Sequence, residues 1–199
     1  NKLVMKRIID IVGAIVGLMI TAVVMLFIAP AVKLESPGPL IFKQKRVGKN
    51  GRYFYIYKVR SMYQDAEARK AELMEKNEMK GFMFKMTDDP RITKVGKFMR
   101  RTSLDELPQL FNILKGDISI VGLRPVMEVE TEIYGNYRDM LLSVKPGLTG
   151  FWAANGRSCT TYTRRRAMEI CYIKNRSVCF DLKIILKTIT SVFKGEGAV

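Results

Sequence analysis

A pair of adjacent acids follows a run of basic residues near the middle of the sequence and offers the clearest means of doing chemistry. Asp105 and Glu106 come shortly after Arg100 and Arg101, within the stretch RRTSLDELPQLFN. Carboxylates can act as nucleophiles, as acids or bases, or as ligands of Mg²⁺. Arginines can hold phosphate groups, so the pattern favours chemistry on a phosphorylated substrate.

The same residues also fit an ordinary helix start. Ser103 and Glu106 have the spacing of a capping box, and acidic residues favour the first turn of a helix. Pro108 interrupts the first turns, as is expected where backbone geometry serves a site. A phosphate held on the basic face would meet the free N–H groups of this helix start. The segment therefore predicts either a plain cap or a site for phosphate chemistry.

The composition limits that chemistry. The chain has no histidine, which excludes Ser-His-Asp and Cys-His catalysis, His-ligated zinc and imidazole acid–base steps. Three cysteines without C-x-x-C spacing, Cys159, Cys171 and Cys179, favour a reducing compartment over a disulfide framework or a structural zinc site. The 34 Lys and Arg exceed the 19 Asp and Glu by 15 charges. This excess predicts a polyanionic partner: nucleic acid, an anionic membrane face or a phosphate-rich substrate.

Residues 11–32 form an uncharged apolar run, and about 20 apolar residues suffice to cross a bilayer as a helix. A signal peptide has a shorter apolar region, so we do not favour one, although Ala29-Pro30-Ala31 mimics a cleavage site. Two interpretations stay open. The helix either spans the membrane, or it is broken near its middle and re-enters on the same side. Basic residues on both flanks predict that both ends face the cytoplasm.

Three small details qualify the apolar run. Pro30 lies near its end, where we expect it to terminate the helix. Gly13 and Gly17 form a G-x-x-x-G step that permits close packing, although a chance pair is the simpler explanation. The chain begins with Asn1 rather than methionine, so we expect a fragment of a longer protein. With 199 residues, it has room for one domain, or for one domain and an anchor.

The remaining sequence predicts short mixed elements, so the expected fold class is α+β and mostly helical. A breaker cluster at residues 36–39 ends the membrane unit, and LIFKQKRV and RYFYIYKV flank a turn at residues 48–51, which predicts a β-hairpin. We expect a solvated helix over 63–80, a helix starting at 88–90, an apolar helix over 107–114 capped by Gly116, and a short strand over 118–121. The basic residues of the second helix, Lys94, Lys97, Arg100 and Arg101, recur at helical spacing. Residues 180–194 predict a basic amphipathic helix, which we place at the membrane interface rather than on the domain.

These motifs together resemble the bacterial sugar transferase family, the monotopic phosphoglycosyl transferases. The resemblance runs nearly end to end, through KRIID, LESPGPLIFKQKRVG, FYIYKVRSM, RRTSLDELPQLFNILKGDISIVG, LRP, KPGLTG, NGR and FDLKIILKT. It implies transfer of a sugar-1-phosphate from a UDP-sugar to a polyprenyl phosphate, with release of UMP. That reaction opens the membrane assembly of capsule, exopolysaccharide or O-antigen.

The resemblance also implies roles for single residues. Asp105 would be a covalent nucleophile and Glu106 its partner, and both would bind Mg²⁺. The candidate phosphate-binding cations are Lys58, Arg100, Arg124 and Arg157. Phosphoryl transfer of this kind depends on positioning and charge stabilisation, and a carboxylate that is ionised at pH 7 needs no general base. The chemistry is therefore compatible with the absence of histidine.

The implied setting is the cytoplasmic face of a bacterial inner membrane. Residues 1–35 would form the membrane-inserted helix and residues 36–199 the cytosolic catalytic domain. The expected partners are the UDP-sugar, the polyprenyl phosphate and membrane lipid, without nucleic acid, and a second copy of the chain is a further candidate. Two departures from the family pattern stand out: Leu123 replaces the usual proline before Arg124, and Thr21, Ala22 and Val23 stand where a helix-breaking Ser-Pro is common.

Two other functions compete with this one. A membrane-tethered binding module would use the basic surface to grip anionic lipid or nucleic acid, with the acidic pair as a mere cap. A glycosyltransferase that moves the sugar without its phosphate would release UDP instead of UMP. The sequence contains no separable motif for the identity of the sugar.

Overall fold

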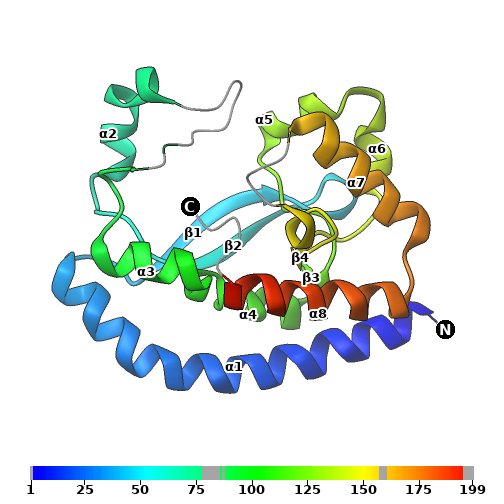
Figure 1. Cartoon of the computed structure of the whole chain (residues 1–199), viewed down its shortest axis with the longest axis horizontal. Coiled ribbons are helices and arrows are strands. Elements are labelled where there is room, and N and C mark those ends of the chain that lie inside the picture. Colours follow the sequence, from blue (N-terminus) through cyan, green and yellow to red (C-terminus); the bar gives the residue numbers. More distant parts are fainter. Residues whose placement is uncertain (1, 78–85, 87, 157–160, 195–199) are drawn as a thin grey trace.

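The structure is a computed structural model that describes residues 2–77, 86, 88–156 and 161–194. Figure 1 shows a long helix, α1, lying as a crescent along one side of a mixed α/β body. The helices are α1 (Lys2–Glu35), α2 (Ala66–Glu72), α3 (Lys94–Thr102), α4 (Gln109–Lys115), α5 (Glu128–Thr131), α6 (Arg138–Leu142), α7 (Tyr162–Asn175) and α8 (Val178–Lys194). The strands are β1 (Ile41–Val47), β2 (Tyr53–Val59), β3 (Ser119–Val121) and β4 (Gly147–Thr149). Five 3₁₀ turns complete the described elements: η1 (Lys49–Gly51), η2 (Met74–Lys76), η3 (Leu104–Glu106), η4 (Glu132–Tyr137) and η5 (Ala153–Asn155). The predicted fold class is confirmed.

Helix α1 is continuous over 34 residues, and its length and composition suffice to cross a membrane. Of the two open interpretations, the helix broken near its middle is wrong, and Pro30 does not end the helix, which continues to Glu35. Proline removes one backbone hydrogen bond. Ile28 and Val32, on either side of it, are 9% and 3% exposed and pack against the body, and this packing holds the helix in place.

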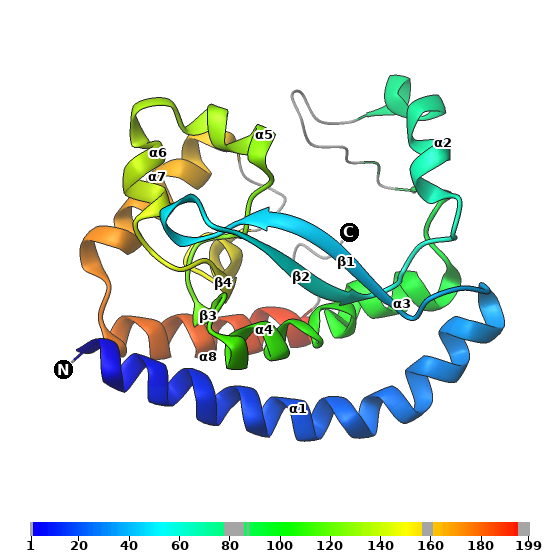
Figure 2. The same cartoon turned by 180° about the vertical axis from the view of Figure 1, so that it is seen from behind.

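Both ends of α1 are bonded to the same body. Near the first end, Lys6 Nζ lies 2.6 Å from Asp181 Oδ2, and Arg7 donates to the carbonyls at the end of α4 at 2.6 and 2.8 Å. Asp10 Oδ1 accepts hydrogen bonds from the Ser119 hydroxyl and the Ile120 N–H, each at 2.9 Å. At the other end, Glu35 accepts hydrogen bonds from the first two N–H groups of α3 at 2.6 and 2.8 Å. The crescent therefore bridges two distant points of the body, as Figure 2 shows from behind.

The G-x-x-x-G step lies on the inner face of α1. A Cβ atom at Gly13 would lie 2.6 Å from the Ile120 side chain, and one at Gly17 would lie 2.7 Å from Leu110. Ala14 between them is fully buried. The two glycines therefore let α1 pack closely against the body, and their spacing is not a chance pair.

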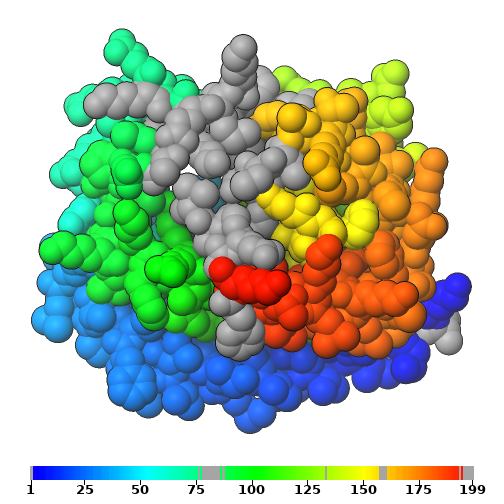
Figure 3. Space-filling model, viewed as in Figure 1, coloured from blue at the N-terminus to red at the C-terminus, as the bar shows by residue number. Residues whose placement is uncertain are grey.

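The outer face of α1 is apolar and exposed. Figure 3 shows α1 along one edge of the molecule with α8 beside it. Large apolar side chains on α1 are about half exposed or more, among them Val12, Met19, Val23, Leu26 and Phe27. Helix α8 has the same two-sided character: Ile184 is buried in the body, and Leu182, Leu186 and Ile189 are exposed. The predicted amphipathic helix is confirmed, but it packs on the domain through its inner face, so the prediction that it does not lie on the domain is wrong.

The predicted hairpin is formed by β1 and β2, which pair antiparallel with Gln44 opposite Ile56. Asn50 and Gly51 supply the positive φ angles of the turn, 57° and 76°. Phe54 and Ile56 pack toward α1 and α4. The hairpin brings Lys58, near the end of β2, beside η3.

Two predicted helices have different bounds in the structure. Of the helix expected over 63–80, the described part holds only the short α2 and the turn η2. Helix α3 begins at Lys94 rather than at residues 88–90, because the Thr93 hydroxyl caps it by accepting from Gly96 N at 2.9 Å. Asp89 pairs instead with Arg91 at 2.7 Å. The strand β3 and helix α4, whose C-cap Gly116 has φ 88°, agree with the predictions.

Candidate active site

The acidic pair lies on a tight turn between α3 and α4. Ser103 ends α3 in the left-handed conformation, with φ 58° and ψ 19°, and the next three residues form η3. The Ser103 side chain makes no capping hydrogen bond to this turn, so the predicted capping box is wrong. Leu104 packs into the core formed by α1, β2 and α3, which fixes the turn. The adjacent acids of this turn, hereafter the dyad (Asp105 and Glu106), both line one cavity.

Asp105 and Glu106 differ in their surroundings. Asp105 is only 7% exposed, and this burial raises the pKa of its carboxyl to about 6. The charge of Lys58 opposes the rise, that of Glu106 adds to it, and that of Arg100 opposes it. This pKa lies above the ordinary aspartate value near 4 because desolvation disfavours the charged form. With a pKa of about 6, roughly nine in ten Asp105 carboxyls are still ionised at pH 7.

Two of the predicted cations lie beside the dyad. Lys58 Nζ lies 2.7 Å from Glu106 Oε1, and the two side chains are 28% and 38% exposed. Arg100 is held by a hydrogen bond from its Nε to the Ser61 hydroxyl at 2.9 Å, and burial lowers its pKa. Both cations act on the charge of Asp105. The corner thus offers one buried carboxylate, one half-exposed carboxylate and two positive groups.

A cavity of about 1170 Å³ extends from the dyad to Arg124 and beyond. Arg124 lines the same cavity, with its Cζ 5.8 Å from the centre of the Trp152 ring. Arg157, the fourth predicted cation, lies outside the described residues. The wall of the cavity near α8 is apolar and includes Ile185, Ile189 and Val192. The cavity therefore joins a charged end, a second cluster of charges and an apolar side.

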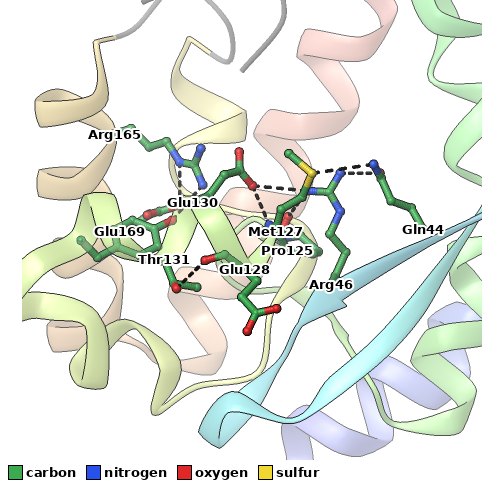
Figure 4. Close-up of polar contacts among 10 residues, drawn as sticks. Gln44, Arg46, Pro125, Met127, Glu128, Glu130, Thr131, Arg165 and Glu169 are labelled. Atoms are coloured by element: carbon green, nitrogen blue, oxygen red, sulfur yellow. Dashed lines mark hydrogen bonds and ion pairs between the residues drawn. The ribbon is translucent and has the colours of Figure 1, made fainter. Parts of the chain in front are cut away.

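The second cluster was not predicted. Figure 4 shows Arg46, Glu130, Arg165 and Glu169 gathered from β1, α5 and α7. Together with Arg124, we call these residues the distal cluster. Arg46 Nη1 donates to Glu130 Oε2 at 3.3 Å, and Arg165 Nε donates to Glu169 Oε1 at 3.1 Å. The i, i+4 spacing of Arg165 and Glu169 was the one signal in the sequence that could have indicated part of it.

The dyad suits Mg²⁺ better than it suits zinc. Among the described residues, no three His, Cys, Asp or Glu side chains form a group that could hold a metal ion. Mg²⁺ is commonly held by one or two carboxylates, with substrate phosphate oxygens and water filling the other positions. Asp105 and Glu106 line the cavity and could supply the two carboxylates, so the residues present fit a metal that arrives with a diphosphate.

Comparison with known proteins gives one family. The model of the bacterial sugar transferase family matches residues 1–195. The galactosyl transferase CpsE of Streptococcus agalactiae serotype III is 49% identical over 199 residues, which cover 100% of this chain and 44% of that protein. The undecaprenyl-phosphate galactose phosphotransferase of Salmonella typhimurium is 41% identical over 198 residues, covering 98% of this chain and 41% of that protein.

A shorter relative matches over most of its own length. The exopolysaccharide production protein ExoY of Sinorhizobium fredii is 38% identical over 197 residues, which cover 97% of this chain and 87% of that protein. The chain therefore spans less than half the length of the first two relatives and most of the length of the third.

Proposed function

Because the chain belongs to the bacterial sugar transferase family, we propose that it transfers a sugar-1-phosphate from a UDP-sugar to a polyprenyl phosphate. The proposal includes a covalent intermediate on Asp105 and the release of UMP. The observation that carries it is a buried carboxylate in the wall of a large cavity, with Lys58 and Arg100 acting on its charge.

The names of the relatives support the substrate classes. One relative is named for undecaprenyl phosphate and galactose, and a second, from Aeromonas hydrophila and 40% identical over 203 residues, for UDP-N-acetylgalactosamine and undecaprenyl phosphate. We take UDP-galactose as the first donor to test because galactose recurs in the relatives' names. Capsule or exopolysaccharide synthesis is the corresponding process.

In the first step, a carboxylate oxygen of Asp105 attacks the sugar-proximal phosphorus of the donor. The bond from that phosphorus to the bridging oxygen breaks, UMP leaves with the electron pair, and an acyl phosphate carrying the sugar remains. A buried carboxylate is poorly solvated, so little solvent has to be displaced before it attacks. No proton is abstracted, because the nucleophile is already ionised above its pKa of about 6.

In the second step, the ionised oxygen of the polyprenyl phosphate attacks the same phosphorus. The bond to Asp105 breaks, which regenerates the carboxylate and leaves the sugar on a lipid diphosphate. The apolar wall formed by Ile185, Ile189 and Val192 of α8 gives the prenyl chain an entrance from the side of the exposed apolar faces of α1 and α8.

The cations hold and neutralise phosphate during both steps. Lys58 and Arg100 lie beside the dyad, where they can contact the reacting phosphoryl group, and Arg124 faces the same cavity farther along. Arg157 keeps its predicted role in phosphate binding. Asp105 and Glu106 would hold Mg²⁺, which supplies charge neutralisation of the diphosphate when bound. Glu106 also positions Lys58 through their 2.7 Å ion pair.

The membrane placement follows from the two ends of α1. Hydrogen bonds fix both ends to one body, and basic residues flank both, which supports a helix that lies in the membrane interface with both ends at the cytoplasmic face. Its exposed apolar side then faces lipid. This placement also brings the cavity to the depth at which a lipid phosphate lies.

The decisive experiment uses the full chain in detergent or nanodiscs with UDP-galactose and Mg²⁺ but no acceptor. We expect UMP release and an adduct with the mass of one hexose phosphate, located by peptide mapping to Asp105. Addition of polyprenyl phosphate should discharge the adduct. In Asp105→Asn, both adduct and turnover should fall by at least about 1000-fold, as for loss of a nucleophile.

Controls separate this reaction from its rivals. Asp139→Asn, which changes an exposed acid on α6, should leave adduct and turnover unchanged. Release of UDP instead of UMP would show transfer of the sugar without phosphate. Absence of any released nucleotide across a panel of UDP-sugars would favour the binding module. Full turnover by Asp105→Asn, with deamidation excluded by mass, would contradict the covalent mechanism.

A further inference from the structure

Apart from Arg124, the members of the distal cluster have no task in the proposed steps at the dyad. The arginine and glutamate pairs of the cluster are almost completely buried, with Arg46 7%, Arg165 5%, Glu130 3% and Glu169 2% exposed. Charged side chains are seldom buried to this degree unless they are paired. Yet the cluster lines the same cavity as the dyad, which identifies it as part of a binding site rather than only a structural core.

The charges in the cluster do not cancel. Three guanidiniums, of Arg46, Arg124 and Arg165, face two carboxylates, so one positive charge is left over. Burial and the charge of Arg124 lower the pKa of Arg46 to about 10, which is a sign of this excess. A buried excess of positive charge favours an anionic ligand.

The cluster also has polar atoms without partners among the described residues. Arg46 Nε, Arg124 Nε and Glu130 Oε1 are buried and form no hydrogen bond there, and neither does the hydroxyl of the neighbouring Tyr162. Figure 4 shows the Glu130 carboxylate between the guanidiniums of Arg46 and Arg165. Donors and an acceptor thus lie side by side, a pattern that a ligand with alternating acceptor and donor groups can satisfy.

An aromatic surface lies next to these atoms. The Cζ atoms of Arg124 and Arg165 lie 5.8 and 4.8 Å from the centre of the Trp152 ring. Aromatic rings and guanidinium planes are the surfaces on which nucleobases stack. Trp152 is the single tryptophan of the chain, so its fluorescence reports on this place alone.

We propose that the distal cluster binds the nucleotide part of the donor, with the uracil ring against Trp152 and its edge at Glu130 and Arg46. This inference rests on the proposed function, since it assigns a subsite for the UMP that the dyad displaces. Uracil presents an N–H donor between two carbonyl acceptors. Glu130 can accept from that N–H, and neighbouring arginines can donate to the carbonyls. Cytosine has an acceptor at the same ring nitrogen, which the Glu130 carboxylate would repel.

The other two substrate groups fit this place less well. A neutral sugar has neither a planar ring to lie against Trp152 nor an N–H group between two carbonyls to meet Glu130 and Arg46. The prenyl phosphate needs an apolar approach, and the apolar wall is formed by α8, whereas the charged side chains of the cluster come from β1, the loop before α5, α5 and α7. The observations therefore favour the nucleotide.

The test measures Trp152 fluorescence in the full-length Asp105→Asn chain, which cannot turn over, during titration with UMP, CMP and galactose-1-phosphate. We expect a saturable change with UMP, at least tenfold weaker binding of CMP, and no change with galactose-1-phosphate. Calorimetry on a Trp152→Phe variant should still detect UMP binding, while the fluorescence signal disappears. Saturable binding of galactose-1-phosphate in place of UMP, or equal binding of UMP and CMP, would overturn the proposal.

Two neighbouring arginines on α7 give a matched pair of variants. Arg165 is buried in the cluster, whereas Arg164 is exposed. Arg165→Gln should weaken UMP binding at least tenfold, and Arg164→Gln should leave it unchanged. Arg165→Lys, which keeps the positive charge but not the two parallel N–H donors of the guanidinium, should have a UMP affinity between those of the wild type and Arg165→Gln. Unaltered UMP affinity in a folded Arg165→Gln chain would overturn the proposal, and the ligand series above tests it even if that variant does not fold.

Failure of this inference and failure of the proposed function give different results. If the wild-type chain releases UMP from UDP-galactose but substitutions in the distal cluster leave UMP binding unchanged, the subsite is wrong and the function stands. If UMP binding depends on the cluster but no sugar phosphate is transferred, the subsite stands and the function is wrong.

Discussion

Asp105 and Glu169 are both buried carboxylates in the wall of one cavity, but their charges are balanced in different ways. Glu169 is 2% exposed and paired with Arg165 at 3.1 Å on its own helix. Asp105 is 7% exposed, and the nearby Lys58 pairs with Glu106 instead. The first carboxylate is held in place by a direct partner. The second is left with its charge poorly compensated, which is the state suited to a nucleophile.

This difference predicts opposite effects on stability when each charge is removed. Glu169→Gln leaves Arg165 buried without its partner, so we expect the free energy of unfolding to fall by about 3–5 kcal/mol. Chemical denaturation in detergent, followed by circular dichroism, measures it. The matched control is Asp65→Asn, at the residue before α2, whose i, i+4 pair with Arg69 is shorter, at 2.6 Å, but about half exposed. That change should lower stability by less than about 0.5 kcal/mol. Equal effects would show that burial does not distinguish the two pairs.

Asp105→Asn should instead stabilise the protein above pH 6. The folded pKa of about 6 lies above the ordinary value, so the free energy of unfolding of the wild type falls as pH rises from about 4 to about 6. The free energy of unfolding of the wild type falls by roughly 2–3 kcal/mol over this range, whereas the asparagine variant has no carboxyl there and does not lose it. Denaturation curves at pH 4.5 and pH 7.5 test this, with Asp139→Asn as the exposed control. A variant less stable than the wild type at pH 7.5 would show that Asp105 is paired after all.

Arg124→Ala tests how far the two ends of the cavity cooperate in catalysis. Loss of a charge-assisted hydrogen bond to phosphate costs about 1.5–3 kcal/mol, so kcat/KM for UMP release should fall about 10- to 150-fold. Arg52→Ala, at the exposed end of the hairpin, is the control and should change it less than twofold. Similar values of kcat/KM for the two variants would show that Arg124 is not part of the site.

Lys58→Met tests the electrostatics at the dyad. The positive charge of Lys58 lowers the pKa of Asp105, so its removal should raise that pKa above about 6. The acidic limb of the pH profile of kcat/KM should move to higher pH by roughly half a unit to one unit. Lys97→Met, an exposed change on α3, should leave the limb in place. A limb that stays in place or moves to lower pH in Lys58→Met would mean that the group titrating in the profile is not Asp105.

Local signals in the sequence predicted much of the fold. The alternation and turn of the hairpin, the Gly116 cap and the adjacency of the dyad are each contained in a few consecutive residues, and each appears in the structure. The left-handed conformation of Ser103 was not predicted because Ser103 and Glu106 also have the spacing of a capping box. Packing of Leu104 in the core decides between a capped helix start and the left-handed turn. The continuity of α1 past Pro30 depends likewise on contacts with distant residues.

The distal cluster shows the limit of reading one segment at a time. Its members come from β1, the loop before α5, α5 itself and α7, more than 100 positions apart at the extremes. Arg124 was predicted as a phosphate-binding cation, and the other four members were not singled out, since only folding brings them together. The roles of the dyad and of the four predicted cations stay predictions, although the structure places Asp105, Glu106, Lys58 and Arg100 together and Arg124 in the same cavity.

Because α1 is attached to the body at both ends, the number of residues in this helix matters as much as its composition. One inserted residue would turn a helix by about 100° and lengthen it by about 1.5 Å. Glu35 would then no longer meet the start of α3 while Asp10 keeps its bonds to β3. Exchanges among apolar side chains on the outer face leave this register intact. Over evolution, the segment between these two points should therefore drift in sequence but not in length, and a generic membrane anchor of another length could not take its place.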